Sequence, residues 1–226
     1  MARRAQTKGA CTYCGRLLTR SGMARHLESC PQRRLALDAA DDRAGPVGPL
    51  FLLEARDAFS GAYWLHLEMN GSAPLGRLDQ YLRAIWLECC GHLSQFSVGG
   101  WRGEEIAMSR KAAQVFRPGM ELTHIYDFGS ESVTLVRVLG RRLGKPTARH
   151  PLALLARNEL PQSDCQECGA PAAFVCQQCH EEVLPGLLCE AHAATHPHDD
   201  YGEPLPIVNS PRFGVCGYDG PALAPY

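Results

Sequence analysis

Apolar residues are concentrated in the middle of the chain, and their spacing changes from one segment to the next. Two apolar runs, 50–57 (LFLLEARD) and 62–70 (AYWLHLEMN), are separated by a short break at 59–61. Apolar runs of this length on either side of a turn favour an antiparallel β-hairpin. The next segment, 75–89, places its apolar residues at helical spacing and predicts one long helix. Gly91 is suited to end that helix.

Shorter segments follow, each bounded by turn residues. Segment 92–100 predicts a short strand and 111–119 a short helix ended by Pro and Gly. Segment 121–140 predicts a second hairpin that turns at 129–130, and 152–160 predicts a last strand. Strands that mostly follow one another directly, with few helices between them, indicate an α+β fold with a mainly antiparallel sheet.

The N-terminal segment carries four candidate metal ligands in the pattern C-x2-C-x11-H-x3-C. They are Cys11, Cys14, His26 and Cys30. This spacing predicts a ββα zinc finger in which Cys replaces the last ligand, so we expect one Zn²⁺ here. A helix over 22–29 would carry the last two ligands on one side. We expect Ser21 to cap that helix and Pro31 to end it.

A second and denser group of ligands occupies 165–198, with the pattern C-x2-C-x7-C-x2-C-x9-C-x2-H-x3-H-x1-H. The spacing resembles that of B-box-like zinc modules, in which two ligand sets alternate along the chain. This resemblance implies two Zn²⁺ ions in a cross-braced pairing. The first set is Cys165, Cys168, Cys189 and His192, and the second is Cys176, Cys179, His196 and His198. Closed tetrahedral sites of this kind stabilise a fold and leave no position for a catalytic water.

Alternatives remain open for this module. His196 and His198 are only two residues apart, so His180 or Cys216 could replace His198 as a ligand. A sequential pairing would instead place the first four cysteines on one zinc ion. A disulfide framework is the third alternative, and it is disfavoured in an intracellular chain.

These patterns divide the chain into four parts. We expect a basic zinc finger at 1–37 and a linker at 38–49, which is acidic and then rich in Gly and Pro. The α+β domain follows at 50–160, and the zinc module with an apolar tail at 161–226. We expect the tail to pack back onto the middle domain.

The formal net charge of −1 is unevenly distributed. Residues 1–37 hold eight basic residues and one acidic residue, for a net charge of +7, and the remainder carries −8. A basic end on an acidic body suggests a polyanionic partner. On the finger, Arg16, Arg20 and Arg25 are the candidate contacts to DNA or RNA. A solvated arm without a partner, or a finger that binds another protein, remains possible on composition alone.

The location of the protein follows from its cysteines and its lack of long apolar runs. The first residues show no apolar stretch of the signal-peptide kind, and no run approaches the ~18 apolar residues of a membrane span. Cysteines in C-x2-C pairs with histidines downstream indicate metal in a reducing compartment. We therefore expect a cytoplasmic protein with no membrane partner. The pattern does not define an oligomeric state.

Four long motifs resemble a known family. They are LDQYLRAIWLECCGHLSQF, PGMELTHIYDFGS, LLARNELP and LPIVNSPRFGVCGY. Over about 50–220 the chain is similar to the plasmid pRiA4b ORF-3-like family, whose members occur on plasmids, near transposons and in bacterial and archaeal chromosomes. It is most similar to a subgroup with an appended Cys-rich module. The resemblance implies an α+β domain and no established biochemical activity.

Candidate catalytic residues are few and lie in the middle domain. His92, His124 and Asp127 would form an enzyme site if they converged in one pocket. Each of these residues also has a structural role that is more common than catalysis. An Asp before Phe-Gly usually hydrogen-bonds the backbone of its own turn, and a His at a helix end is usually stabilised by the helix dipole. The pair Cys89-Cys90 is either redox-active or, more commonly for cysteine, a buried small apolar group.

The sequence thus favours a zinc-binding, non-catalytic protein that contacts nucleic acid through its finger. Some relatives in the resembled family are labelled resolvase-like, but the chain has no serine-recombinase nucleophile context and no DDE-like carboxylate set. A protein-interaction scaffold acting through the B-box-like module is the alternative. An enzyme of unknown reaction in the middle domain is the third hypothesis.

Overall fold

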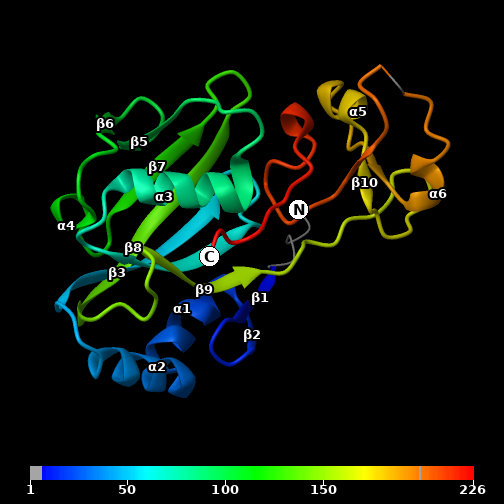
Figure 1. Ribbon diagram of the computed structural model, residues 1–226. Coiled ribbons are helices and arrows are strands. Elements are labelled where there is room, and N and C mark those ends of the chain that lie inside the picture. The colour runs from blue at the N-terminus through cyan, green and yellow to red at the C-terminus, as the bar shows by residue number, and fades with distance from the viewer. Residues whose placement is uncertain (1–6, 199) are drawn as a thin grey trace.

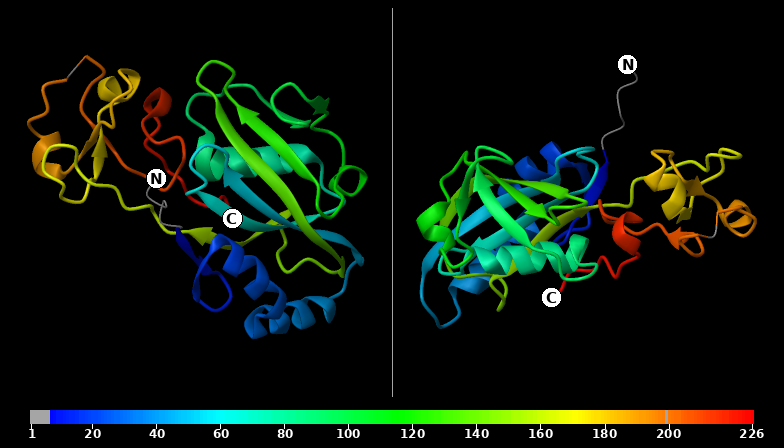
Figure 2. Two further views of the ribbon diagram at one scale, coloured as in Figure 1. Left: turned by 180° about the vertical axis from the view of Figure 1, so that it is seen from behind. Right: turned by 90° about the horizontal axis from the view of Figure 1, so that it is seen from above.

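The computed structural model describes residues 7–198 and 200–226 (Figure 1). A large sheet with helix α3 across one face makes up most of the molecule. The N-terminal finger lies at one edge of this sheet, and a small module projects to the side (Figure 2). Arg3 and Arg4 of the basic end lie outside the described residues. No described helix is long and apolar enough to cross a bilayer.

Within the described residues, nine strands form one sheet in the spatial order β2-β1-β9-β4-β3-β8-β7-β5-β6. All neighbouring pairs are antiparallel. The strands are β1 Lys8–Cys11, β2 Leu17–Thr19, β3 Gly48–Asp57, β4 Trp64–Asn70, β5 Ser94–Val98, β6 Glu104–Ile106, β7 Glu121–Tyr126, β8 Ser132–Gly144 and β9 Leu152–Asn158. The predicted α+β fold with a mainly antiparallel sheet is therefore confirmed, and both predicted hairpins are present as β3–β4 and β7–β8.

The single long helix expected over 75–89 is not present. An α-helix, α3 (Leu75–Leu82), passes into a π-helical turn, η1 (Arg83–Leu87), which the Glu88 amide closes by donating to the Arg83 carbonyl at 2.8 Å. The π-turn contains three consecutive apolar residues, Ile85, Trp86 and Leu87, each 0% exposed. All three belong to the main core cluster, so the wider turn accompanies the burial of three consecutive positions, more than the one-sided stripe of an amphipathic α-helix buries.

The finger is joined to the main sheet by backbone pairing. Strand β1 pairs with β2 in the predicted hairpin and also with β9 of the middle domain. Gly9 permits this close approach, since an added Cβ would lie 2.1 Å from the Arg157 carbonyl oxygen. Helix α1 (Arg20–Ser29) is capped by Thr19, whose hydroxyl accepts from the Gly22 amide, so the expected Ser21 cap is wrong.

A second helix, α2 (Pro31–Asp41), follows α1 directly. Pro31 does end α1, as expected, but it also occupies the first position of α2, where its missing N–H costs nothing. Residues 38–49 were expected to form a linker. Helix α2 extends to Asp41, inside this segment, and β3 begins at Gly48, near its end. The helix is anchored by Arg33, which is only 8% exposed.

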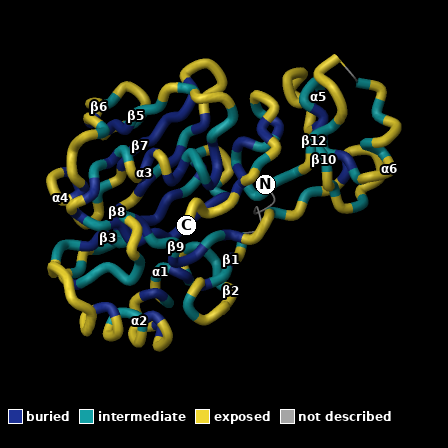
Figure 3. Tube along the Cα trace, viewed as in Figure 1, coloured by how far each residue is buried: buried dark blue, intermediate teal, exposed yellow. Residues whose placement is uncertain are grey.

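The side module is built from very short elements. They are β10 Phe174–Val175, α5 Gln177–Glu181, β11 Leu187–Leu188, α6 Glu190–Ala193 and β12 Leu205–Pro206. The strands form a small sheet in the order β11-β10-β12. Its buried cluster consists of Cys176, Cys179 and Leu188, so most of the module is exposed or only half-buried (Figure 3). So small an apolar core cannot by itself hold a fold together.

The remaining helices are the short α4 (Ala112–Val115) and the 3₁₀ turn η2 (Val215–Gly217). The latter belongs to the tail, which packs back onto the middle domain as expected. Ser210 and Arg212 are 0% exposed, and the Ser210 hydroxyl donates to the Trp86 carbonyl at 2.5 Å. Farther along, the Arg157 guanidinium donates to the Ala222 carbonyl at 2.7 Å.

Candidate metal centres

The four candidate ligands of the finger converge on one point. Cys11, Cys14, His26 and Cys30 offer ligand atoms that all lie within 4.8 Å of one another. The hairpin turn supplies Cys14, and α1 brings His26 Nε2 to 3.2 Å from its Sγ. Cys11 and Cys30 are buried beneath this pair. The hairpin and helix are therefore joined by side chains suited to hold a metal ion.

Local electrostatics prepare Cys14 and His26 for metal binding, whereas burial raises the pKa of Cys11. A hydrogen bond from the Arg16 backbone amide and the charge of Arg16 lower the pKa of Cys14, which promotes its thiolate. Burial, together with the same guanidinium, lowers the pKa of His26 and keeps its imidazole neutral. A thiolate and a neutral imidazole are the species that coordinate zinc.

In the side module the eight ligands fall into two groups with the expected alternating membership. Cys165, Cys168, Cys189 and His192 form one group, and Cys176, Cys179, His196 and His198 form the other. In the first, His192 Nδ1 lies 3.5 Å from Cys165 Sγ and 3.3 Å from Cys189 Sγ. In the second, Cys179 Sγ lies 3.3 Å from His196 Nε2 and 3.2 Å from His198 Nδ1. The alternative ligands, His180 and Cys216, are in neither group.

The separations within these groups fit tetrahedral zinc. With Zn–S bonds of about 2.3 Å and Zn–N bonds of about 2.0–2.1 Å, a sulfur and a nitrogen lie about 3.5 Å apart and two sulfurs about 3.8 Å apart. The sulfur–nitrogen distances above are close to the first value. Cys168 Sγ and Cys189 Sγ, at 3.9 Å, match the second. The Cys-rich donor sets themselves also favour zinc over harder cations such as magnesium or calcium.

The Cys165 thiol shows how the backbone prepares a ligand. Burial by itself raises its pKa, but hydrogen bonds from the amides of Cys189, Glu167 and Cys168 bring the pKa down to about 6. At neutral pH this sulfur is therefore a thiolate ready to bind a cation.

The three arginines proposed for nucleic-acid contact lie in different surroundings. Arg16 and Arg25 are exposed on the finger, with no carboxylate within ion-pair distance among residues 7–198 and 200–226. Arg20 instead pairs with Glu54 of β3 at 3.5 Å. Its carbonyl also contacts His66 Nε2 at 3.1 Å, so the start of α1 lies against the sheet. The helix end that would enter a DNA groove in an isolated finger is thus partly covered.

The three candidate catalytic residues do not all converge, because His92 and Asp127 are neighbours but His124 pairs with a different carboxylate. His124 is 0% exposed and its Nε2 lies 2.8 Å from Asp79 Oδ1, beneath α3. Asp127 accepts from the Gly129 amide at 2.9 Å, which is the turn role expected for it. It also pairs with Arg212 at 2.6 Å and lies 3.4 Å from His92 Nε2. The carboxylate is therefore occupied by structural partners.

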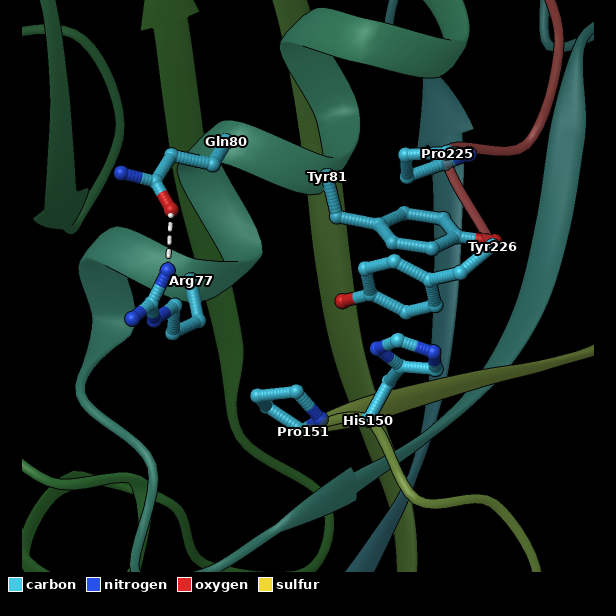
Figure 4. A pocket seen from close by; sticks show the side chains of 7 residues that line it. All are labelled: Arg77, Gln80, Tyr81, His150, Pro151, Pro225 and Tyr226. Atoms are coloured by element: carbon cyan, nitrogen blue, oxygen red, sulfur yellow. Dashed lines mark hydrogen bonds between the residues drawn. The ribbon is translucent and has the colours of Figure 1, made fainter.

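A pocket of about 400 Å³ lies elsewhere, between α3 and the C-terminal residues (Figure 4). Three rings line one side of it: His150 stacks on Tyr226 at 4.0 Å between ring centroids, and Tyr226 lies 5.5 Å from Tyr81. Across from them, Arg77 donates to the Gln80 side chain at 3.0 Å. The lining residues include no Asp, Glu or Cys, and none of the candidate catalytic residues is among them.

One further group was missed when the residues were considered by spacing. Cys89, Cys90 and His92 lie close to Cys216 of the tail, with ligand atoms within 4.8 Å. The local signal is the C-C-x-H pattern, for which the sequence favours a buried, apolar cysteine pair over a redox-active one, beside a helix-end histidine. Cys90 is exposed, so the expected burial of this pair does not hold for it.

The fold and these groups define an α+β protein with several Cys/His clusters able to hold metal ions. No protein-family model matches the chain, and no curated protein matches it. Among solved structures, the crystal structure of MM3350 from Methanosarcina mazei Go1, described as a protein of unknown function, is similar to this chain. The match covers 68% of this chain and 85% of that chain, with a TM-score of 0.43 and 15% sequence identity.

Proposed function

We propose that this protein is a zinc-binding, non-catalytic protein that contacts nucleic acid through the exposed face of its N-terminal finger. The observation that carries the nucleic-acid part is the exposure of Arg16 and Arg25 without carboxylate partners in the described structure. The metal part rests on the convergence of the Cys/His groups. We propose one Zn²⁺ in the finger and two in the side module.

The position of the finger determines how it would bind. Arg20 pairs with Glu54, and Arg33 is buried against Glu68, so each of these two guanidinium groups already has a carboxylate partner. Two free guanidinium groups on a finger fixed to a sheet suit backbone phosphates better than base edges. We therefore propose salt-dependent binding to DNA or RNA with little sequence preference.

A fluorescence anisotropy titration of the zinc-loaded protein tests this proposal, with a duplex DNA and a single-stranded RNA in a salt series. The double variant Arg16→Gln, Arg25→Gln should reduce the slope of log K against log salt for duplex DNA by about 1.8, for two lost phosphate contacts. The double variant Arg102→Gln, Arg110→Gln is the matched control, since both arginines are exposed between β5 and α4 and it removes the same number of charges. Zinc content is measured in parallel, because Arg16 lies beside the finger ligands.

Two outcomes would reject nucleic-acid binding. One is no change in anisotropy with either probe at low salt. The other is an equal change in slope for the Arg102→Gln, Arg110→Gln control and the finger variant, which would show that only the overall charge matters.

We also propose membership of the pRiA4b ORF-3-like family, on the four motifs quoted above. In support, two motif residues far apart in the chain have a common role: Asp127 of YDFG and Arg212 of SPRFG form a buried ion pair. A reducing compartment such as the cytoplasm suits the protein, because free thiolates are the proposed ligands.

A protein-interaction role for the side module is the second candidate. It is favoured by Val183 and Leu184, which are 91% and 49% exposed in the loop between Cys179 and Cys189. The variant Val183→Ser, Leu184→Ser keeps all ligands and removes this apolar surface. Recovery of the same partners by this variant and the unmodified chain in affinity purification would reject the role.

A further inference from the structure

The loop that follows η1 and the 3₁₀ turn η2 of the tail bring four metal-binding side chains together. They are Cys89, Cys90, His92 and Cys216. Cys90 Sγ lies 2.8 Å from His92 Nε2 and 3.6 Å from Cys216 Sγ, although 126 residues separate the two cysteines. Cys216 Sγ lies 3.5 Å from His92 Nε2, and Cys89 Sγ lies 3.5 Å from Cys90 Sγ.

These separations resemble those in the three expected clusters. A tetrahedral zinc ion requires sulfur–sulfur distances of about 3.8 Å and sulfur–nitrogen distances of about 3.5 Å. Three of the four contacts lie between 3.5 and 3.6 Å. The fourth, between Cys90 Sγ and His92 Nε2, is shorter at 2.8 Å. The donor set of three sulfurs and one nitrogen is the same as in the finger.

The backbone at Cys216 is a second and independent indication. Cys216 has φ 53° and ψ 36°, the left-handed conformation that non-glycine residues seldom adopt. Gly214 and Gly217, with φ of 75° and 70°, provide the turn on either side of it. Holding a cysteine in this conformation costs on the order of 1 kcal/mol or more and requires a compensating interaction. Here the conformation directs its sulfur at the loop after η1.

Residues around the cluster supply the charge balance that such a site needs. Three thiolates and one Zn²⁺ carry a net charge of −1, and the Arg212 guanidinium donates to Cys89 Sγ at 3.4 Å. Arg212 is 0% exposed and is itself oriented by Asp127 at 2.6 Å. The Tyr126 hydroxyl lies 3.7 Å from the same sulfur. Partners of this kind orient ligands and tune their basicity in known metal sites.

The distribution of the cysteines among the clusters also supports a metal site here. All eleven cysteines of the chain belong to four-membered groups once this one is included.

We propose that Cys89, Cys90, His92 and Cys216 bind a fourth Zn²⁺, which fastens the C-terminal tail to the end of η1. The tail begins directly after β12 of the side module, so this ion also fixes the module beside the sheet. The site is independent of the finger and of nucleic-acid binding.

Zinc stoichiometry of the full chain tests the proposal. Protein purified under reductant is analysed by native mass spectrometry and elemental analysis, as the unmodified chain and as Cys90→Ser, Cys216→Ser. The variant should hold one zinc ion fewer per chain. Because both cysteines are exposed, it should keep its fold, which hydrogen exchange in β7 and β8 verifies.

A matched pair of histidine variants provides the control. His92→Gln should lose one zinc ion, whereas His180→Gln, at an exposed histidine outside every cluster, should lose none. Hydrogen exchange over 209–226 should rise in His92→Gln, as in Cys90→Ser, Cys216→Ser, but not in His180→Gln. Cys14→Ser removes a finger ligand and reports on that site separately, so failure of one site does not imply failure of the other.

Either of two results would overturn the fourth site. The first is equal zinc content in the unmodified chain and in both the Cys90→Ser, Cys216→Ser and His92→Gln variants. The second is a Cys90–Cys216 disulfide in the zinc-saturated protein, seen as a loss of two hydrogen masses, since an oxidised pair cannot act as two thiolate ligands.

Discussion

Glu68 of β4 lies between two guanidinium groups, and its replacement by Gln tests how the finger region is held to the sheet. Arg33 of α2 approaches its carboxylate at 3.3 Å, and Arg142 of β8 binds it in a bidentate manner at 2.7 and 2.9 Å. The Glu68 and Arg33 side chains are only 4% and 10% exposed. Arg33 also donates to the Leu27 carbonyl at 2.7 Å, which connects α1 to the same network.

Glu68→Gln removes the charge that compensates two cations and leaves Arg33 buried beside an amide. Breaking a buried ion pair by removing one partner costs about 3–5 kcal/mol, because the other charge is left uncompensated. For a chain of this size, a loss of about 3 kcal/mol lowers Tm by roughly 6–12 °C. We expect the lower end of this range in free energy, since the Gln carbonyl still accepts one hydrogen bond.

The same helix provides an internal control. Arg34 and Asp38 form an i,i+4 pair on α2, at 3.4 Å, with side chains 79% and 63% exposed. An exposed helical pair of this kind contributes about 0.3–0.5 kcal/mol. Asp38→Asn should therefore lower the stability by a small fraction of what Glu68→Gln does, although both substitutions remove one carboxylate that faces an arginine of α2.

Urea unfolding of the zinc-saturated protein, followed by circular dichroism, measures both variants. Adding Arg33→Met to Glu68→Gln removes the uncompensated buried cation but also the donor to the Leu27 carbonyl, so the double variant should be close in stability to Glu68→Gln alone. The coupling between the two sites should be about 2 kcal/mol. A cost below 1 kcal/mol for Glu68→Gln, or a cost equal to that of Asp38→Asn, would refute the reasoning.

Further predictions concern the finger, one buried histidine and the metal. Thr19→Ala should cost about 1 kcal/mol in thermal unfolding by removing the cap of α1, whereas Ser21→Ala should have little effect; equal losses would contradict this assignment. Gly9→Ala places a Cβ 2.1 Å from the facing carbonyl oxygen and should separate β1 from β9, and unchanged amide exchange in β1 would show otherwise. Burial lowers the pKa of His66 to about 4 in the folded protein, whereas a histidine in the unfolded chain has a pKa of about 6.5. Below pH 6.5 the unfolded chain therefore binds more protons at this residue than the folded protein does. The contribution of His66 to stability should therefore fall by about 3 kcal/mol as the pH drops from 6.5 to 4, and nitrogen NMR showing a protonated His66 at pH 5 would refute this. Chelation of zinc should raise hydrogen exchange throughout 163–198 while β3 and β8 stay protected, because the side module has almost no apolar core.

Local patterns in the sequence were sufficient for much of the fold and for the expected clusters. The hairpins β3–β4 and β7–β8 follow from apolar runs flanking a turn, and both involve neighbours along the chain. The C-x2-C pairs and the i,i+4 ligands are equally local, since a tight turn or one helical turn sets their geometry. This locality is the reason the groups in the finger and the side module were predictable.

Features that depend on long-range packing were not predictable in this way. The π-turn η1 contains three consecutive residues that are all buried in the core, and α2 is anchored because Arg33 reaches Glu68 on another element. The pairing of Arg20 with Glu54 changes which finger charges are free. None of these contacts has a signature in the spacing of nearby residues.

The cysteines show most clearly which features local sequence determines and which depend on the tertiary structure. The sequence by itself determined that Cys11, Cys165 and their neighbours lie on turns and helices that gather ligands. Only the tertiary structure placed Cys216 beside Cys90, because strand order and the return of the tail across η1 bring these distant residues together. Bringing two distant residues together costs chain entropy, so their contact is not determined until the whole core has packed. Ligands within one turn are already neighbours in any compact state of the chain.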